Sequence, residues 1–388
     1  MEREQAIKFM LDLLKLMLKK KASDLFITSG FPPAMKIDGK MTPVSKQALT
    51  TESAKALTYS IMNDRQLKEY DATKECNFAV SPPGIGRFRC NAFVQQGRPG
   101  LVMRTISTDV PSIDALRLPD VLKDVIMTKN GLVIMVGGTG SGKSTSLAAM
   151  IDYRNTNTYG HIITIEDPVE FVHPHKNCVI MQREVGVDTE GWDVALKNTL
   201  RQAPDVILLG EIRDRETMEF AIQFAETGHL ALATLHANNA NQALDRIINF
   251  FPEERRTQLL MDLSANLKGI ISQRLLKKAD GAGRVAAIEI LLNSPLISDL
   301  ILKGEMHEIK PIMAKSNELG MKTFDQALFD LYESDQITYD DAMRYADAVN
   351  ELRLRIKLEG KEAKSQDALS GLDHLSLEET EEEQGFIR

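Results

Sequence analysis

The residues with the clearest chemical potential run from Gly137 to Ser144 and read Gly-Gly-Thr-Gly-Ser-Gly-Lys-Ser. They match G-x-x-x-x-G-K-[ST], a loop that binds nucleotide phosphates, at every fixed position. In that pattern backbone N–H groups surround the α- and β-phosphates, the lysine reaches the β/γ-phosphates, and the last hydroxyl binds Mg²⁺. We therefore expect ATP and Mg²⁺ here, with nucleotide-binding residues Gly137, Gly138, Thr139, Gly140, Ser141, Gly142, Lys143, Ser144 and Thr145.

The segments on either side of this loop provide the context that the motif requires. Residues 132–136 are all apolar and predict a buried strand, whereas 145–151 contain no Gly or Pro and predict a helix. A chance match to the motif is expected in on the order of one chain in a hundred of this length, before the strand and helix are demanded. We therefore interpret the segment as a phosphate-binding loop rather than a Gly-rich turn.

Three apolar strands predicted after the loop each end in a polar side chain. Parallel strands of an α/β sheet present their carboxyl ends at one edge, where such folds bind ligands, so these side chains are expected to converge on the loop. They are Glu166 after strand 162–165, Glu211 after strand 206–209 and His236 after strand 230–235.

These side chains fit the hydrolysis of a phosphoanhydride. That reaction needs a metal ion on the β/γ oxygens, an acceptor that orients water, and positive charge on the developing oxygens. We assign Glu211 with Ser144 to Mg²⁺ binding, Glu166 to water orientation, and His236 to sensing of the γ-phosphate, with His229 as a second candidate. The alternatives are ordinary strand-end carboxylates and core histidines.

Arginines ahead of the loop are candidates for the missing positive charge. Segments 76–80 and 87–94 predict a hairpin, and alternation places Arg87 and Arg89 on one face of it. A further strand, 101–106, carries Arg104. Arg89 and Arg104 would contact the nucleotide if their domain folds over it; a solvated face is the alternative.

Length and composition limit the class of protein. The chain has 388 residues, 43% of them hydrophobic, which favours two folded domains, and no apolar run approaches the ~18 residues of a membrane span. The net charge is −8, of which −5 falls on residues 361–388, so the near-neutral body does not support nucleic-acid binding. The three scattered cysteines predict no thiolate zinc cage.

The order of elements predicts two fold types in one chain. An amphipathic helix over 7–18, short strands at 23–28 and 34–37, a helix over 51–70 and the hairpin make a small α+β domain. Alternating strands and helices then make a largely parallel sheet, followed by a mostly helical stretch over 240–275, a strand at 284–291 and further helices. The expected boundaries are 1–107 for the first domain, 108–118 for a linker, 119–358 for the α/β domain and 359–388 for an acidic, disordered tail.

Four motifs in order resemble the Walker A, Asp, Walker B and His boxes of secretion ATPases. They are 137–145, 162–170, 205–214 and 234–238, accompanied by Ser23-Asp24-Leu25, Gly86-Arg87-Phe88-Arg89 and Gln182-Arg183-Glu184-Val185. The resemblance covers about residues 1–350 and is strongest to the type IV pilus retraction ATPases of the PilT/PilU group.

This resemblance implies a PAS-like N-terminal domain and a RecA-like motor domain in a homo-hexameric ring. It also implies that Glu166 is the catalytic acid/base, that Glu211 is the Walker B acid, and that Arg89 contacts the nucleotide. Such rings lie on the cytoplasmic side of the inner membrane at the pilus base, without inserting into it. There they act on the inner-membrane platform protein and power retraction and twitching motility.

Two departures point to the accessory branch of the group, which works beside a PilT-like ATPase. Phe26 stands where the main retraction ATPase has His, and Pro295 to Ile301 departs from the element tied to retraction. The alternatives are a pilus assembly or type II secretion ATPase, which typically carries a four-cysteine zinc element, and an ATP-binding ring subunit with a mainly structural role.

Overall fold

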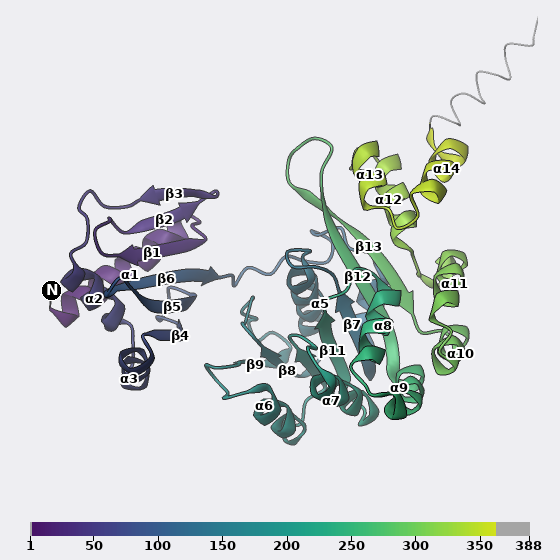
Figure 1. Ribbon diagram of the computed structural model, residues 1–388, viewed down its shortest axis with the longest axis horizontal. Helices are drawn as coiled ribbons and strands as arrows, with labels where there is room; N and C mark the ends of the chain where they lie inside the picture. The colour runs from purple at the N-terminus through teal and green to yellow at the C-terminus, as the bar shows by residue number, and fades with distance from the viewer. Residues whose placement is uncertain (1, 362–388) are drawn as a thin grey trace, which may run out of the picture.

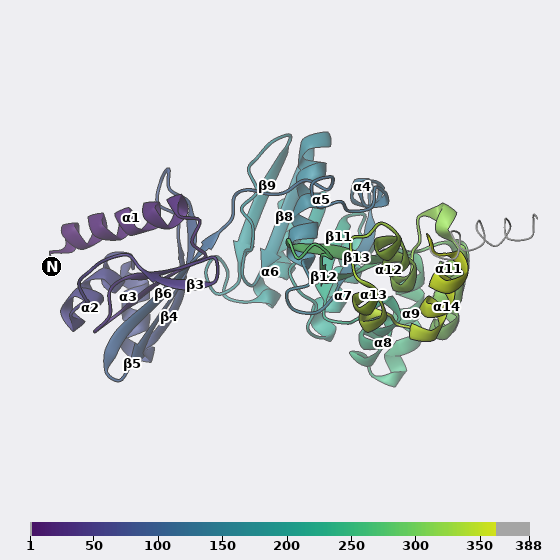
Figure 2. The ribbon, with the colours of Figure 1, turned by 90° about the horizontal axis from the view of Figure 1, so that it is seen from above.

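The computed structural model describes residues 2–361, which form two bodies joined by one extended segment (Figure 1). Figure 2 shows the same two bodies side by side from above. The expected acidic tail lies almost wholly outside the described residues. Among residues 2–361, no helix is both long enough and apolar enough to cross a membrane.

The first body is built on an antiparallel sheet with strand order β3-β2-β1-β6-β5-β4. Its first helix has apolar residues at helical spacing, and Ala6, Met10 and Leu14 are fully buried. The elements are α1 (Arg3–Lys19), β1 (Asp24–Thr28), β2 (Ala34–Ile37), β3 (Lys40–Pro43), α2 (Thr51–Ser60), α3 (Asp64–Thr73), β4 (Glu75–Val80), β5 (Arg87–Gln95) and β6 (Arg98–Ile106).

The single helix expected over 51–70 is two helices. Asn63 caps the second one, because its side chain accepts from Gln66 N while the Gln66 side chain accepts from Asn63 N. Such a capping box satisfies two backbone donors that a helix start leaves unpaired, and it fixes a new helix origin at this point.

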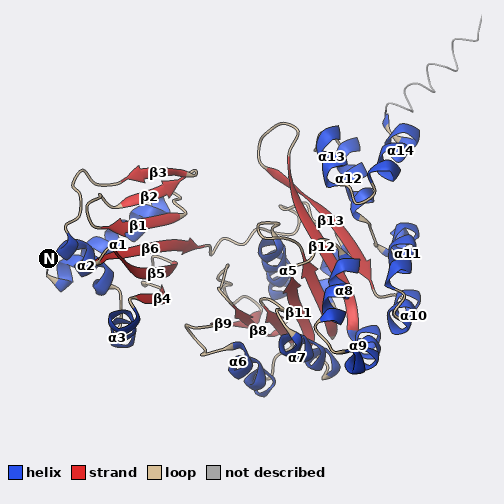
Figure 3. Cartoon of the chain, in the orientation of Figure 1, coloured by secondary structure: helices blue, strands red, loops and turns tan. Residues whose placement is uncertain are grey.

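The second body is built on a seven-stranded sheet with order β13-β12-β7-β11-β10-β8-β9, parallel except for β13 (Figure 3). This confirms the α/β class with a smaller α+β domain ahead of it. Its elements up to residue 277 are α4 (Val121–Met127), β7 (Gly131–Val136), α5 (Lys143–Asn157), β8 (Gly160–Glu166), β9 (Cys178–Glu184), α6 (Trp192–Thr199), β10 (Val206–Leu209), α7 (Arg215–Glu226), β11 (Leu230–Leu235), α8 (Ala240–Asn249), α9 (Glu253–Asn266) and β12 (Leu267–Lys277).

Two apolar layers cover this sheet. Alternate residues of β7 point to opposite faces: Ile134 packs in the layer that contains α6 to α9, and Met135 in the layer that contains α4 and α5. The remaining elements are β13 (Arg284–Leu292), α10 (Pro295–Lys303), α11 (Ile309–Lys315), α12 (Phe324–Glu333), α13 (Tyr339–Tyr345) and α14 (Val349–Glu359). Helices α12 to α14 form a C-terminal unit with its own apolar core against β12 and β13.

The expectation of helix from 240 to 275 is wrong for its last part, because 267–277 form strand β12. The strand is inserted between β7 and β13, and Ile270 and Ile271 lie buried there. Lys268 is an extra residue in its pairing with β7, since Leu267 opposes Leu132 whereas Gly269 opposes Val133. Burial on both faces, rather than local periodicity, decides this segment.

The end of the first body contacts the segment that follows β8. Ser107 forms a parallel bridge with Phe171, and Val172 N donates to Ser107 O at 3.0 Å. Arg87 of β5 adds a side-chain contact to the second body, with its guanidinium 3.5 Å from a Glu184 carboxylate oxygen. The first body is therefore tied to the loop beyond Glu166.

Candidate nucleotide site

The phosphate-binding loop joins β7 to α5, as its motif predicts. Gly142 has φ +87°, and α5 begins at Lys143 directly after it. A Cβ at Gly137, where φ is +154°, would lie 2.6 Å from the backbone oxygen of Gln273, so only glycine fits there. The Lys143 ammonium donates to Gly137 O at 2.6 Å and Gly138 O at 2.9 Å. The lysine therefore lies within the loop, and burial lowers its pKa.

Gln273 of β12 supports this loop through its side chain. No motif in the sequence predicts that role. Its Nε2 donates to Ser141 O at 2.8 Å, and its Oε1 accepts from Ser146 Oγ at 2.7 Å. The side chain is 3% exposed. Since a buried amide whose donor and acceptor both have partners has a fixed orientation, Gln273 fixes the loop against the start of α5.

A pocket of about 360 Å³ opens above the loop and brings most of the candidate residues together. Glu166, Glu211 and His236 all line it, from the ends of three neighbouring strands. The loop contributes Thr139, Gly140, Lys143 and Ser144 to its wall, whereas Gly138 lies with His236 in an adjoining open hollow.

Glu166 is almost fully buried in the wall of this pocket, with 9% of its surface exposed. Its Oε1 accepts from Thr164 Oγ1 at 2.7 Å and from Gln182 Nε2 at 3.3 Å. Burial raises the pKa of Glu166 to about 7, against the opposing effect of these neutral donors. A carboxylate with a pKa near neutrality is suited to take a proton from water.

Glu211 has charged or ionisable partners on both oxygens. Its Oε2 accepts from Arg213 Nε at 2.6 Å, and its Oε1 lies 3.0 Å from His236 Nε2. Arg213 also reaches Asp167 at 3.3 Å, which joins the Walker B segment to the loop after β8. The sequence did not single out Arg213 because nothing in its spacing distinguishes it from a surface arginine.

His229 does not line this pocket. It stands at the start of β11, and the strand runs from there to His236 at the opposite edge of the sheet. Its Nδ1 instead contacts Thr227 Oγ1 at 3.0 Å and Phe224 O at 3.2 Å. The six residues of β11 separate the two histidines, so only His236 reaches the phosphate side.

Arg89 and Arg104 also lie away from the pocket of their own chain. They are cross-strand partners on β5 and β6, and Arg104 Nε donates to Asp24 at 2.8 Å. The first body does not fold over the loop, and the arginine that touches the second body is Arg87. Within one chain, neither predicted arginine lines the pocket above the phosphate loop.

A second pocket, of about 310 Å³, flanks the other side of the loop. Gly142, Thr145, Leu275 of β12 and the linker residue Arg117 are among the residues that line it. Its walls thus combine apolar groups with cations next to the start of α5.

Comparison with known proteins identifies the family. The family described as Type II/IV secretion system protein matches residues 2–330. The chain is 57% identical over 371 residues to the type IV pilus ATPase PilU of Pseudomonas aeruginosa, covering 96% of this chain and 97% of that protein. It is 43% identical over 335 residues to PilT, the retraction ATPase of the same organism, covering 86% and 97%.

A solved structure gives the same answer in three dimensions. The crystal structure of the pilus retraction motor PilT with bound ADP matches with a TM-score of 0.83 and 40% identity, over 88% of this chain and 98% of that one. Both the sequence and the fold therefore place the chain in the family of type II/IV secretion system proteins, in the group that contains the pilus ATPases PilT and PilU.

Proposed function

We propose that this chain hydrolyses ATP in a ring motor that powers type IV pilus retraction, as an accessory to a PilT-like ATPase. It is an ATPase of the pilus retraction group by its relatives. The observation that carries the site assignment is the convergence of Lys143, Ser144, Glu166 and Glu211 on one pocket.

The geometry supports a division of tasks around the γ-phosphate. The Lys143 ammonium would leave the carbonyls of Gly137 and Gly138 for the β/γ oxygens of ATP, which are stronger acceptors. Glu166 would orient the attacking water and accept its proton. His236, held at Glu211, would report whether a γ-phosphate is present.

The residues present fit a magnesium ion. Ser144 and Glu211 supply the oxygen donors that Mg²⁺ prefers, and among residues 2–361 no cluster of three or more His, Cys, Asp or Glu side chains makes a dedicated metal cage. A bound Mg²⁺ would neutralise charge on the β/γ oxygens. Glu211 would exchange its contact with Arg213 or His236 to bind the ion directly.

The second pocket suits the nucleoside part of ATP. It adjoins Thr145 at the start of α5, where a nucleotide with its phosphates in the loop would continue. Leu275 offers an apolar wall and Arg117 a planar cation that stacks on bases. We therefore assign the adenine to this side of the loop.

The missing positive charge would come from another subunit. We propose a homo-hexamer in which Arg89 and Arg104 of one chain face the pocket of its neighbour, because neither reaches the pocket of its own chain. In this arrangement the ring works at the cytoplasmic face of the inner membrane and acts on the platform protein of the pilus. No observation favours an assembly ATPase over this function.

The test replaces the loop lysine. Lys143→Ala should abolish ATP hydrolysis by the purified full chain, because no other residue of the loop supplies a cation. Lys123→Ala, which removes a half-buried lysine of α4 outside the pocket, is the control. In cells, twitching should require a PilT-like ATPase beside this chain. In cells that have both, Lys143→Ala in this chain should weaken twitching. Wild-type turnover by Lys143→Ala would refute the site assignment, and retraction by this chain alone would refute the accessory role.

A further inference from the structure

The loop that follows β11 carries His236, and the C-terminal unit contacts this loop on the side away from the pocket. His236 Nε2 lies 3.0 Å from Glu211 Oε1. Two residues later, Asn238 O accepts from Arg274 at 3.1 Å, and Asn239 donates to Asp347 Oδ2 at 3.2 Å. The position of His236 therefore depends on contacts made on the side of the loop away from the pocket.

Arg274 is the central donor of these contacts. It follows Gln273 on β12, so the residue that clamps the phosphate loop and the residue that holds the His236 loop are adjacent and point to opposite faces. Besides Asn238 O, its guanidinium donates to Tyr345 O at 2.6 Å and to Asp347 Oδ1 at 2.7 Å. It also lies 3.9 Å from the centre of the Phe324 ring. The planar guanidinium of Arg274 therefore connects the loop after β11, the segment between α13 and α14, and the start of α12.

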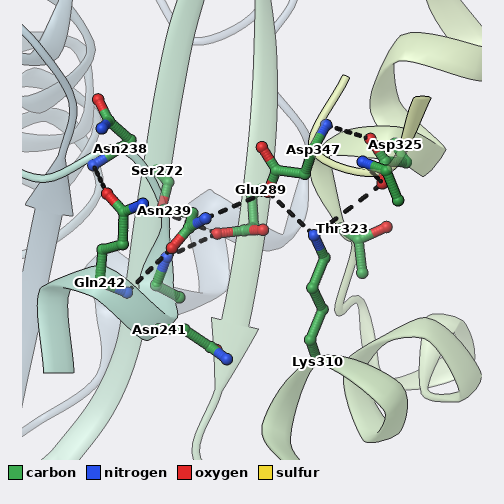
Figure 4. Close-up of polar contacts among 12 residues, drawn as sticks. Asn238, Asn239, Asn241, Gln242, Ser272, Glu289, Lys310, Thr323, Asp325 and Asp347 are labelled. Carbon is green, nitrogen blue, oxygen red and sulfur yellow. Dashed lines mark hydrogen bonds and ion pairs between the residues drawn. The ribbon is translucent and has the colours of Figure 1, made fainter. Parts of the chain in front are cut away.

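Asp347 is the acceptor on the other side. It lies between α13 and α14, and besides Arg274 it binds Lys310 at 3.0 Å. Although burial acts to raise its pKa, the two cations hold the pKa of Asp347 below its ordinary value. Asp325 accepts from Asp347 N at 2.8 Å and so fixes the backbone of the same residue (Figure 4).

The start of α8 completes the support of the loop. Asn239 caps the helix by accepting from Gln242 N at 2.9 Å, and the buried Glu289 accepts from Ala240 N at 2.7 Å and from Ser272 Oγ at 3.2 Å (Figure 4). Both ends of the short stretch from His236 to Ala240 are therefore anchored, one at Glu211 and the other at the network around Asp347.

We infer that Arg274 and Asp347 are positioning residues that keep His236 at Glu211, so that turnover depends on the docked C-terminal unit. This inference rests on the proposed function, because it concerns the same pocket. It assigns the unit formed by α12 to α14 a role in catalysis through the loop, beyond covering β12 and β13.

The test compares two arginines that stack on phenylalanines of α12. Arg274→Lys keeps the charge and loses the fork, and should lower kcat about tenfold with KM for ATP within about twofold. Arg355, 4.4 Å from the Phe329 ring centre, makes no contact with the His236 loop, so Arg355→Gln should leave both constants unchanged. Asp347→Asn, which keeps the shape of the side chain, should behave like Arg274→Lys.

A double-mutant cycle separates positioning from general stability. In a His236→Ala background, Arg274→Lys should have no further effect on kcat, since the side chain that it positions is gone. Equal effects in both backgrounds, or unchanged kcat in Arg274→Lys, would overturn the inference. Thermal unfolding of each full-chain variant shows whether it is folded. If Asp347→Asn is misfolded, the kcat of Arg274→Lys alone tests the inference. Inactivity of the wild-type chain would instead refute the proposed function.

Discussion

The ends of β8 and β10 lie side by side in the sheet, and each carries a glutamate into the same pocket, but the two surroundings differ in charge. Glu166 is almost fully buried, and its carboxylate accepts from the neutral side chains of Thr164 and Gln182. Glu211 is more accessible and is bound by the guanidinium of Arg213 and the imidazole of His236.

This difference separates the tasks of two chemically identical side chains. Burial raises the pKa of the Glu166 carboxyl and makes it a base that can take a proton, whereas the Glu211 carboxylate already binds a cation, the guanidinium of Arg213. Glu166 therefore fits proton transfer and Glu211 fits binding of cations, by environment rather than by residue type.

The largest expected effect comes from removing the base. Glu166→Gln should lower kcat about 10²- to 10⁴-fold while nucleotide binding is retained, because the amide keeps the shape and cannot accept the proton. Steady-state ATPase rates and binding of a fluorescent ADP analogue measure the two quantities. Glu226→Gln, on α7 outside the pocket, is the control.

The pH dependence of folding stability gives an independent test of Glu166→Gln. Burial raises the pKa of Glu166 from 4.5 to about 7, so the folded state binds a proton that the unfolded state has lost, and wild-type stability falls as the pH rises through that window. Glu166→Gln lacks this ionisation and should lose less stability between pH 5 and pH 8. A steeper loss than in the wild type would contradict the buried, proton-accepting role.

A smaller effect is expected when the carboxylate of Glu211, a proposed Mg²⁺ ligand, is replaced by a neutral amide. Glu211→Gln should raise the Mg²⁺ concentration for half-maximal ATPase activity about tenfold or more, because a neutral amide binds the ion weakly. A Mg²⁺ titration at saturating ATP measures it. Glu219→Gln breaks a comparable ion pair, to Arg215 on the surface of α7, and should leave the titration unchanged. An unchanged titration for Glu211→Gln would remove Glu211 from the metal site.

The smallest expected effect is a shift in the pH dependence of kcat when a neighbour of Glu166 is replaced. The wild-type kcat should fall as the pH drops below about 7, because protonated Glu166 cannot act as a base. Gln182→Leu removes a donor that stabilises the ionised form, so the midpoint should move to higher pH by roughly half a unit to one unit. Gln258→Leu removes an exposed amide–carboxylate contact on α9 and serves as the control. A shift to lower pH would show that Gln182 does not stabilise the carboxylate.

Much of the pocket could be predicted because its residues are fixed by local patterns. The phosphate loop is one contiguous motif, and Glu166, Glu211 and His236 each end an apolar strand, so the fold class alone brings them together. His229 failed the same reasoning because a residue at the start of a parallel strand faces the opposite edge.

The supporting residues could not be predicted, because their roles depend on pairings between distant segments. Gln273 lies 132 residues beyond Ser141, and it meets the loop only because β12 joins the sheet beside β7. Arg274 and Asp347 are likewise brought together by the docking of the C-terminal unit. Sequence periodicity indicates whether a segment is amphipathic, but it does not tell which strand will lie beside it.

Lys268, the unpaired residue in β12, affects which side chains of this strand face the phosphate loop. Side chains of a strand alternate, so a one-residue slip sends every group to the other face. If Lys268 paired with Val133 instead of remaining unpaired, every later residue of β12 would shift by one position along β7, and Ser272 would take the place of Gln273 while Gln273 took that of Arg274. The unpaired residue thus sets the register of the rest of the strand, and a variant in which it paired with β7 would present different side chains to the phosphate loop.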